Sequence, residues 1–184
     1  MVIVGITGTH GAGKGTITKY LTREHGFAYF SVSQFLAAEV ERKGLTANRN
    51  ARAELANEYR SKGPTALMEA VYRTIDPTLP RVVLEPQYTT DEVRFIHLKG
   101  GIVIAVNASL ETRYARVQKR GGLKDAISFE EFKAFQEREM GSSNSNQQNL
   151  ASAMAEADIQ LQNNGTVEEL EQALESELTK RNLI

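Results

Sequence analysis

The sequence predicts a three-layer α/β/α fold, with a five-stranded, mostly parallel β-sheet covered by helices on both faces. Short, continuously apolar stretches alternate along the chain with longer segments whose apolar residues recur at helical spacing. A strand that is apolar at every position is buried on both faces, which is typical of parallel sheets joined by helices. The length of 184 residues suits one domain.

The first half of the chain contains three of the expected strands, at Met1 to Ile6, Phe27 to Val32 and Arg81 to Glu85. Helices are expected between them at Gly13 to Glu24, Ser33 to Lys43, Arg49 to Ser61 and Pro64 to Ile75. Gly26 ends the first helix, because glycine adopts the left-handed conformation that closes a helix. Pro64 suits the first turn of the last of these helices, where its missing N–H has no partner to lose.

The second half supplies strands at Ile102 to Val106 and Ile159 to Gln162. The helices expected here are Asp91 to Lys99, Ser109 to Arg120, Ser128 to Met140, Leu150 to Ala157, and a last one that follows Thr166. Ser128 and a glutamate three residues later form a capping box, and Thr166 caps the last helix. The core-facing residues of that helix are predicted to be Val167, Leu170, Leu174 and Leu178.

A glycine-rich turn joins the first strand to the first helix, with the sequence Gly8-Thr9-His10-Gly11-Ala12-Gly13-Lys14-Gly15-Thr16. Its glycines allow successive backbone N–H groups to point at phosphate oxygens, and the helix N-terminus adds positive potential. Lys14 is placed to reach the β- and γ-phosphates of a nucleotide. An ordinary glycine-rich turn does not need a lysine there. A dinucleotide-binding turn needs a third glycine where Thr16 stands, and an acid after the next strand.

Ligands of parallel α/β sheets bind beyond the carboxyl ends of the strands, where Gly8, Ser31, Glu85 and Asn107 are expected. Glu85 ends an apolar strand, the position from which an acid holds Mg²⁺ directly or through water. We predict that Thr16 and Glu85 serve the metal. The alternative is that Glu85 only caps a loop.

Arginines recur on one face of the helix that ends at Arg120. Phosphoryl transfer needs positive groups around the migrating phosphoryl, so Arg120 is predicted to act as a catalytic lid arginine and Arg116 to bind the nucleotide. The alternative for these side chains is a solvated helix face. Asn163 and Gly165 follow the last strand and could meet an adenine ring, or form an ordinary turn.

The composition and net charge limit the kinds of molecule that this protein is expected to bind. A net charge of −1 argues against general binding of nucleic acid or membrane surfaces. No apolar stretch is long enough to span a bilayer, and cysteine is absent, which excludes disulfides and thiolate metal sites. We therefore expect a cytoplasmic protein with a small-molecule substrate. The oligomeric state stays open.

Nearly the whole chain resembles the P-loop kinases grouped around dephospho-coenzyme A kinase and nucleoside monophosphate kinases, including an archaeal-type kinase family of uncertain substrate. The matching segments are the loop Gly8 to Thr16, Ser31 to Leu36, Asn57 to Pro64, Val82 to Glu85, Gln147 to Asn149, Ala157 to Ile159 and Asn163 to Thr166. The resemblance implies a single kinase domain over residues 1–184, using ATP and Mg²⁺. It also implies an acceptor-side helical insert at about 33–76, with Gln34 and Arg60 beside the acceptor, and a lid at about 120–146.

Two departures from the family concern the acceptor side. Relatives carry an aspartate where this chain has Ser33-Gln34, and an arginine soon after the third-strand acid, where it has Pro86 to Tyr88. An amide cannot take a proton from an acceptor. The leading hypothesis is an ATP-dependent kinase for a nucleotide-like acceptor, and the alternative is a degenerate nucleotide-binding module that acts as a switch or partner. A GTPase is disfavoured, because the residues from Val106 to Ser109 lack the guanine-binding Asn-Lys-x-Asp motif.

Overall fold

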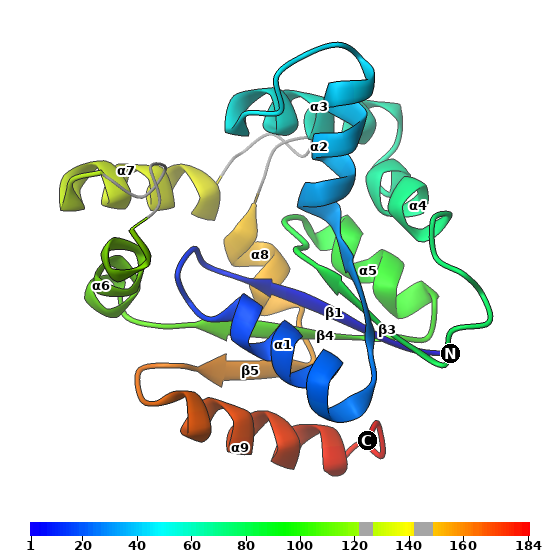
Figure 1. Cartoon of the computed structure of the whole chain (residues 1–184), viewed down its shortest axis with the longest axis vertical. Helices are drawn as coiled ribbons and strands as arrows, with labels where there is room; N and C mark the ends of the chain where they lie inside the picture. The colour runs from blue at the N-terminus through cyan, green and yellow to red at the C-terminus, as the bar shows by residue number, and fades with distance from the viewer. Residues whose placement is uncertain (122–126, 142–148) are drawn as a thin grey trace.

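The computed structural model describes residues 1–121, 127–141 and 149–184. Its sheet has five strands in the order β2-β3-β1-β4-β5, and every neighbouring pair is parallel. The strands are β1 Val2–Gly8, β2 Ala28–Ser31, β3 Arg81–Glu85, β4 Ile102–Asn107 and β5 Ile159–Gln162 (Figure 1). The predicted α/β/α sheet is therefore confirmed, and β1 with its following loop lies at its centre.

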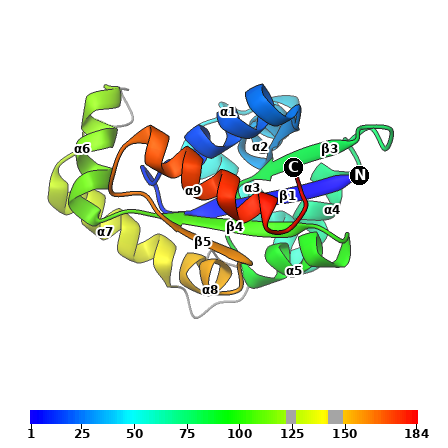
Figure 2. The same ribbon diagram turned by 90° about the horizontal axis from the view of Figure 1, so that it is seen from below.

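Helices in the described ranges pack on both faces of this sheet (Figure 2). Helices α1 (Lys14–His25) and α9 (Val167–Thr179) cover one face. The other face is covered by α2 Val32–Arg42, α3 Arg49–Lys62, α4 Ala66–Tyr72, α5 Thr90–Leu98 and α8 Leu150–Ala155. Helices α6 (Leu110–Arg120) and α7 (Phe129–Met140) lie beyond the carboxyl ends of the strands, at the end opposite the N-terminus (Figures 1 and 2). No described helix is long and apolar enough to cross a membrane.

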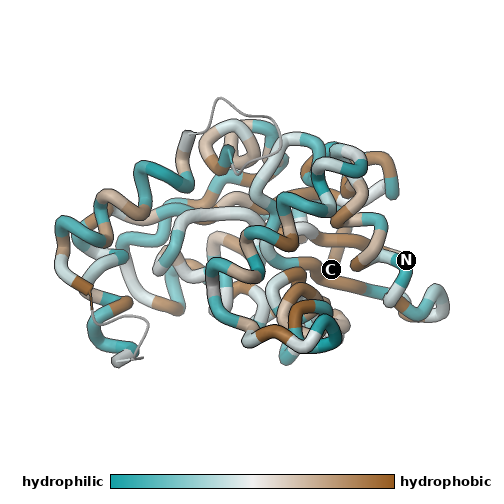
Figure 3. Tube along the Cα trace, turned by 90° about the horizontal axis from the view of Figure 1, so that it is seen from above, coloured by the Kyte–Doolittle hydropathy of each residue, from teal (hydrophilic) through white to brown (hydrophobic). Residues whose placement is uncertain are grey.

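Alternation along the strands divides the core between the two faces. In β3, Val82 and Leu84 pack under α2 to α5, whereas Val83 packs under α1 and α9. In β4, Val103 lies on the face covered by α2 to α5, and Ile104 lies on the face covered by α1 and α9. Figure 3 shows the result as hydrophobic strands inside, between helices of mixed hydropathy. Burial on both faces explains why these strands are apolar throughout.

The structure corrects two details of the element predictions. The first strand continues to Gly8, because β1 pairs with β4 as far as Gly8 opposite Val106. Val167 was predicted to lie on the core face of the last helix. It is instead 50% exposed, at the first position of that helix. The capping box at Ser128 is present as predicted, and Thr166 caps the last helix as predicted. The structure adds that Glu169 completes a second capping box at Thr166.

The predicted helical insert and lid correspond to α2–α4 and to α7. The division of the chain into these parts stays a prediction. Positions 122–126 and 142–146 of the predicted lid lie outside the described residues.

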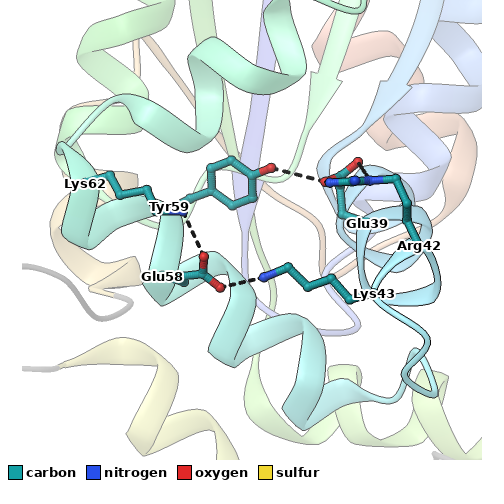
Figure 4. Close-up of polar contacts among 6 residues, drawn as sticks. All are labelled: Glu39, Arg42, Lys43, Glu58, Tyr59 and Lys62. Atoms are coloured by element: carbon teal, nitrogen blue, oxygen red, sulfur yellow. Dashed lines mark hydrogen bonds and ion pairs between the residues drawn. The ribbon is translucent and has the colours of Figure 1, made fainter.

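An exposed ionic network joins α2 to α3 within the insert (Figure 4). Glu58 accepts hydrogen bonds at 2.8 Å from both Lys43 and Lys62. The Tyr59 hydroxyl donates to Glu39 at 3.4 Å across the same pair of helices. The two lysines lower the pKa of Glu58 to about 2, from an ordinary value of 4.5. The network therefore favours the charged carboxylate in the folded state.

We expect Glu58→Gln to lower the free energy of unfolding slightly at neutral pH, because it removes a charge that two lysines share. The pKa of Glu58 is lower in the folded than in the unfolded chain, so its contribution is present above about pH 4.5 and is lost as the pH falls toward 2. Thermal unfolding of both proteins at pH 7 and pH 2.5, with and without added salt, measures this. A stability difference that is as large at pH 2.5, or in high salt, as it is at pH 7 without added salt contradicts the prediction.

Candidate nucleotide-binding site

The loop between β1 and α1 has the backbone conformation that its glycines were expected to allow. Gly8, Gly11 and Gly13 have φ angles of 145°, 80° and 111°, in the region that favours glycine. Gly13 is the residue that directly precedes α1, and no side chain caps that helix. The first N–H groups of α1 therefore face the loop, where an anion can accept their hydrogen bonds.

The loop also packs tightly against its neighbours. A Cβ atom at Gly8 would overlap the carbonyl oxygen of Val106 on β4, and one at Gly13 would overlap the Asn163 amide. The Thr9 hydroxyl donates to Oδ1 of Asn107 at 2.7 Å, which ties the loop to the end of β4. The curled backbone is thus fixed by packing as well as by its glycines.

We expect Gly8→Ala to destabilise the fold by about 3 kcal/mol or more, because the added methyl group meets a backbone carbonyl at a φ that L-residues rarely adopt. Gly15→Ala is the matched control, since nothing lies within 4 Å of a Cβ at Gly15. Chemical denaturation of the two variants and the wild type measures the difference. Equal stability of both variants would contradict the packing described here.

Lys14 is the first residue of α1, and its side chain points back to the loop. Its Nζ donates to the carbonyl oxygens of Gly8 at 2.7 Å and Thr9 at 3.1 Å. Burial lowers the pKa of Lys14 below its ordinary value of 10.5, while the carboxylates of Glu85 and Glu139 oppose this shift. The ammonium is thus held at the loop by backbone carbonyls and lies within the electrostatic reach of two acids.

Glu85 stands at the end of β3, in register with Ser31 on β2. The hydroxyl of Tyr29 donates to its Oε2 at 2.8 Å. The carboxylate of Glu85 and the hydroxyl of Thr16, in the first turn of α1, are the hard oxygen donors that Mg²⁺ prefers. Among the described residues no three His, Cys, Asp or Glu side chains gather as a metal site. This donor set therefore fits a metal that takes its other ligands from phosphate and water.

The residues predicted to meet adenine are bonded to the loop and to one another. Asn163 is buried, and its Nδ2 donates to the Ala12 carbonyl at 2.7 Å while its backbone N–H donates to Asn107 O at 2.7 Å. Arg116 donates to the carbonyl oxygens of Asn163 at 2.8 Å and Gly165 at 3.1 Å. The side-chain amide of Asn163 thus supports the phosphate-binding loop from behind, a structural role that the sequence prediction missed.

Arg113 belongs to the interior, although its spacing placed it on the same basic face as Arg116 and Arg120. It is 7% exposed, and its Nε donates to the Ala108 carbonyl at 2.9 Å. A short hydrogen bond joins it to the side-chain oxygen of Gln136, on α7. The buried guanidinium therefore fastens α6 to α7.

Arg120 is exposed, and its Nη2 lies 3.4 Å from Nε2 of His10 in the loop. The His10 ring also packs against two rings of α7, with centroid distances of 6.1 Å to Phe132 and 6.3 Å to Phe135. His10 therefore joins the loop to both α6 and α7. The sequence placed His10 only within the glycine-rich loop, because its aromatic partners lie far along the chain.

Arg60, predicted to bind the acceptor, is buried in an ion pair. Its Nε and Nη2 donate to Oε1 of Glu92 at 2.9 and 2.7 Å, and the two side chains are 3% and 1% exposed. The guanidinium is therefore bound to α5 in this structure, and its predicted contact with an acceptor stays a prediction. Gln34 is exposed in the first turn of α2, and its backbone N–H donates to the capping Ser31 hydroxyl at 3.1 Å.

Glu92 also reaches the loop that follows β3. Its Oε2 accepts a hydrogen bond from the Tyr88 N–H at 2.7 Å, and the Tyr88 carbonyl accepts one from the Asn149 N–H at 3.0 Å. No role of Glu92 could be predicted from sequence, since nothing local distinguishes it from other helical glutamates. This buried acid fixes the chain just beyond Glu85.

Fold and loop together define a P-loop nucleotide-binding protein of the kinase-like class. A family model described as an AAA domain matches residues 4–141, and the chain belongs to this family. It is 29% identical over 175 residues to a UPF0200 protein of Pyrobaculum aerophilum, with 94% of each chain covered. A UPF0200 protein of Hyperthermus butylicus is also 29% identical over 175 residues, covering 92% of this chain and 89% of that one.

Solved structures agree with this class. TT1252 from Thermus thermophilus is 28% identical with a TM-score of 0.61, and 97% of each chain is covered. Shikimate kinase from Bacteroides thetaiotaomicron has a TM-score of 0.65 at 16% identity, covering 97% of this chain and 98% of that one. A gluconokinase from Sinorhizobium meliloti has a TM-score of 0.59 at 12% identity, covering 98% and 92%. The last two likenesses show the fold alone, and the predicted resemblance to P-loop kinases is confirmed.

Proposed function

We propose that this protein is an ATP-dependent kinase that transfers a γ-phosphoryl group to a small, nucleotide-like acceptor, of the nucleoside monophosphate or dephospho-coenzyme A type. One observation carries the proposal. Lys14 and three positive-φ glycines surround the N-terminus of α1 at the carboxyl edge of a parallel sheet, beside Glu85 on β3. This is where a triphosphate finds backbone donors, a cation and a metal-binding acid together.

In this proposal the loop amides and Lys14 hold the phosphates of ATP, and Arg116 and Gly165 border the adenine. Thr16 and Glu85 hold Mg²⁺, which neutralises the phosphate oxygens when bound. Arg120 leaves His10 and contacts the transferring group, where a guanidinium stabilises charge spread over the phosphoryl oxygens.

An acceptor oxygen attacks the γ-phosphorus, and the bond from that phosphorus to the β,γ-bridging oxygen breaks, so that ADP departs with the bonding electron pair. A hydroxyl acceptor also releases its proton to water, whereas a phosphate acceptor attacks as the oxyanion. Gln34 and Glu85 border the acceptor, and Arg60 supports that side indirectly through Glu92.

Coupled assays of ADP release test the proposal, with nucleoside monophosphates and dephospho-coenzyme A offered as acceptors in turn. We expect one class of acceptor to raise the rate well above the acceptor-free background. The absence of acceptor-stimulated turnover with every compound contradicts the kinase proposal.

The exposed amide of Gln34 and the commitment of Arg60 to Glu92 favour a second candidate, a nucleotide-binding module without efficient transfer. Such a module binds ATP in calorimetry and gives negligible ADP release. Transfer that appears in Gln34→Asp would show that the acceptor side is still built for chemistry, and would count against a purely structural role.

A further inference from the structure

Separate hydrogen bonds hold the beginning of α2 and the acid at the end of β3. The Gln34 N–H donates to the Ser31 hydroxyl at 3.1 Å, and the Tyr29 hydroxyl donates to Oε2 of Glu85 at 2.8 Å. Ser31 and Glu85 are paired in the sheet, so the cap of α2 and the proposed metal ligand lie side by side.

The sheet register explains how Tyr29 reaches this acid. Ser31 pairs with Glu85 and Tyr29 pairs with Val83, so the tyrosine lies on the same face as Glu85, two residues back along the neighbouring strand. Tyr29 is 39% exposed at the sheet edge, and it takes no part in the buried core. Its hydroxyl therefore contributes orientation to Glu85 rather than packing to the fold.

The hydrogen bond from Tyr29 makes the two carboxylate oxygens of Glu85 different. Oε2 accepts from Tyr29, and Oε1 has no hydrogen bond to any residue in the described ranges. One oxygen is thus fixed by the protein, and the other is left for a ligand.

We infer that Tyr29 is a positioning residue, whose hydroxyl holds the Glu85 carboxylate so that its second oxygen serves the Mg²⁺–nucleotide complex. This inference rests on the proposed function. Residues that hydrogen bond a metal ligand from outside typically change metal affinity by 10- to 100-fold when they are removed.

The test uses Tyr29→Phe, which removes one oxygen and keeps the ring. Mn²⁺ is the probe, titrated in the presence of ADP and followed by electron paramagnetic resonance, which needs no turnover. We expect the Mn²⁺ dissociation constant to rise about 10-fold, with little change in ADP affinity measured without metal. Thermal unfolding is expected to match the wild type, because the side chain packs in no core.

Two other tyrosine–glutamate pairs supply matched controls. Tyr59→Phe removes a hydroxyl that bonds Glu39 between α2 and α3 (Figure 4), and Tyr20→Phe removes one that bonds Glu175 between α1 and α9. Both controls should leave Mn²⁺ binding unchanged. In a Glu85→Gln background, adding Tyr29→Phe should cause much less than the 10-fold loss, because the carboxylate it orients is gone.

Mn²⁺–ADP binding by Tyr29→Phe that equals that of Tyr59→Phe overturns the inference and leaves the proposed nucleotide site standing. A full additional loss in the Glu85→Gln background overturns it as well, since Tyr29 would then act elsewhere. A wild-type protein that binds neither ADP nor Mn²⁺–ADP overturns the inference and the proposed function together.

Discussion

Lys14→Ala is expected to reduce nucleotide turnover by about 10²–10³-fold, because it removes the cation nearest the loop that would bind the phosphates. The fold should survive, since the lysine's hydrogen bonds within the described ranges go to the carbonyl oxygens of Gly8 and Thr9, and its burial disfavours its own charge. Calorimetric titration with Mg²⁺–ATP, the ADP-release assay and thermal unfolding measure the three quantities separately.

Lys19→Ala is the control for that experiment, because Lys19 is exposed on the same helix α1. It loses the same charge without touching the loop, so its nucleotide affinity should match that of the wild type. If Lys14→Ala and Lys19→Ala behave alike, the loop does not bind phosphate, and the proposed function fails with it.

Arg60→Met is expected to lower the free energy of unfolding by about 3–5 kcal/mol, since it leaves the Glu92 carboxylate buried without its cation. The pair has little contact with water, as the side chains are 3% and 1% exposed. Urea denaturation measures the loss. Arg52→Met is the control on the same helix, where the guanidinium donates, among the described residues, to the Asn48 carbonyl alone.

The double variant Arg60→Met with Glu92→Gln separates charge from packing. An amide oxygen can still accept the Tyr88 N–H, while the unpaired charge is gone. The double variant should therefore be more stable than Arg60→Met alone, and the two changes should not add. A small loss in Arg60→Met, similar to that of Arg52→Met, would show that the carboxylate finds another partner or is protonated at little cost.

Features of the fold that depend on local sequence were predictable. The capping box at Ser128 rests on residues three positions apart, the cap at Thr166 on one residue, and the strands on short apolar runs. The end of β1 was not predictable from sequence, because Gly8 belongs to the strand through its pairing with Val106 of β4. Val167 shows a similar limit, since helical spacing gives a face but not where the core begins beneath it.

Some features of the candidate site could likewise be predicted from sequence and others could not. The loop from Gly8 to Thr16 could be located from spacing alone, because phosphate binding uses consecutive backbone groups. The roles of Arg60 and Arg113 could not, because their partners Glu92 and Gln136 lie on other helices. A side chain's spacing shows which face it occupies, but only tertiary packing shows whether that face meets ligand, solvent or a buried acid.

The backbone of Tyr88 connects two parts of the molecule through hydrogen bonds. Its N–H is held by Glu92, which in turn holds Arg60 of α3, and its carbonyl is held by Asn149 at the entrance to α8. A ligand that displaces α3 would therefore also act on the backbone beside Glu85 and on the first residues of α8. Under the proposed function, binding of an acceptor beside α3 would be coupled to the position of the proposed metal ligand.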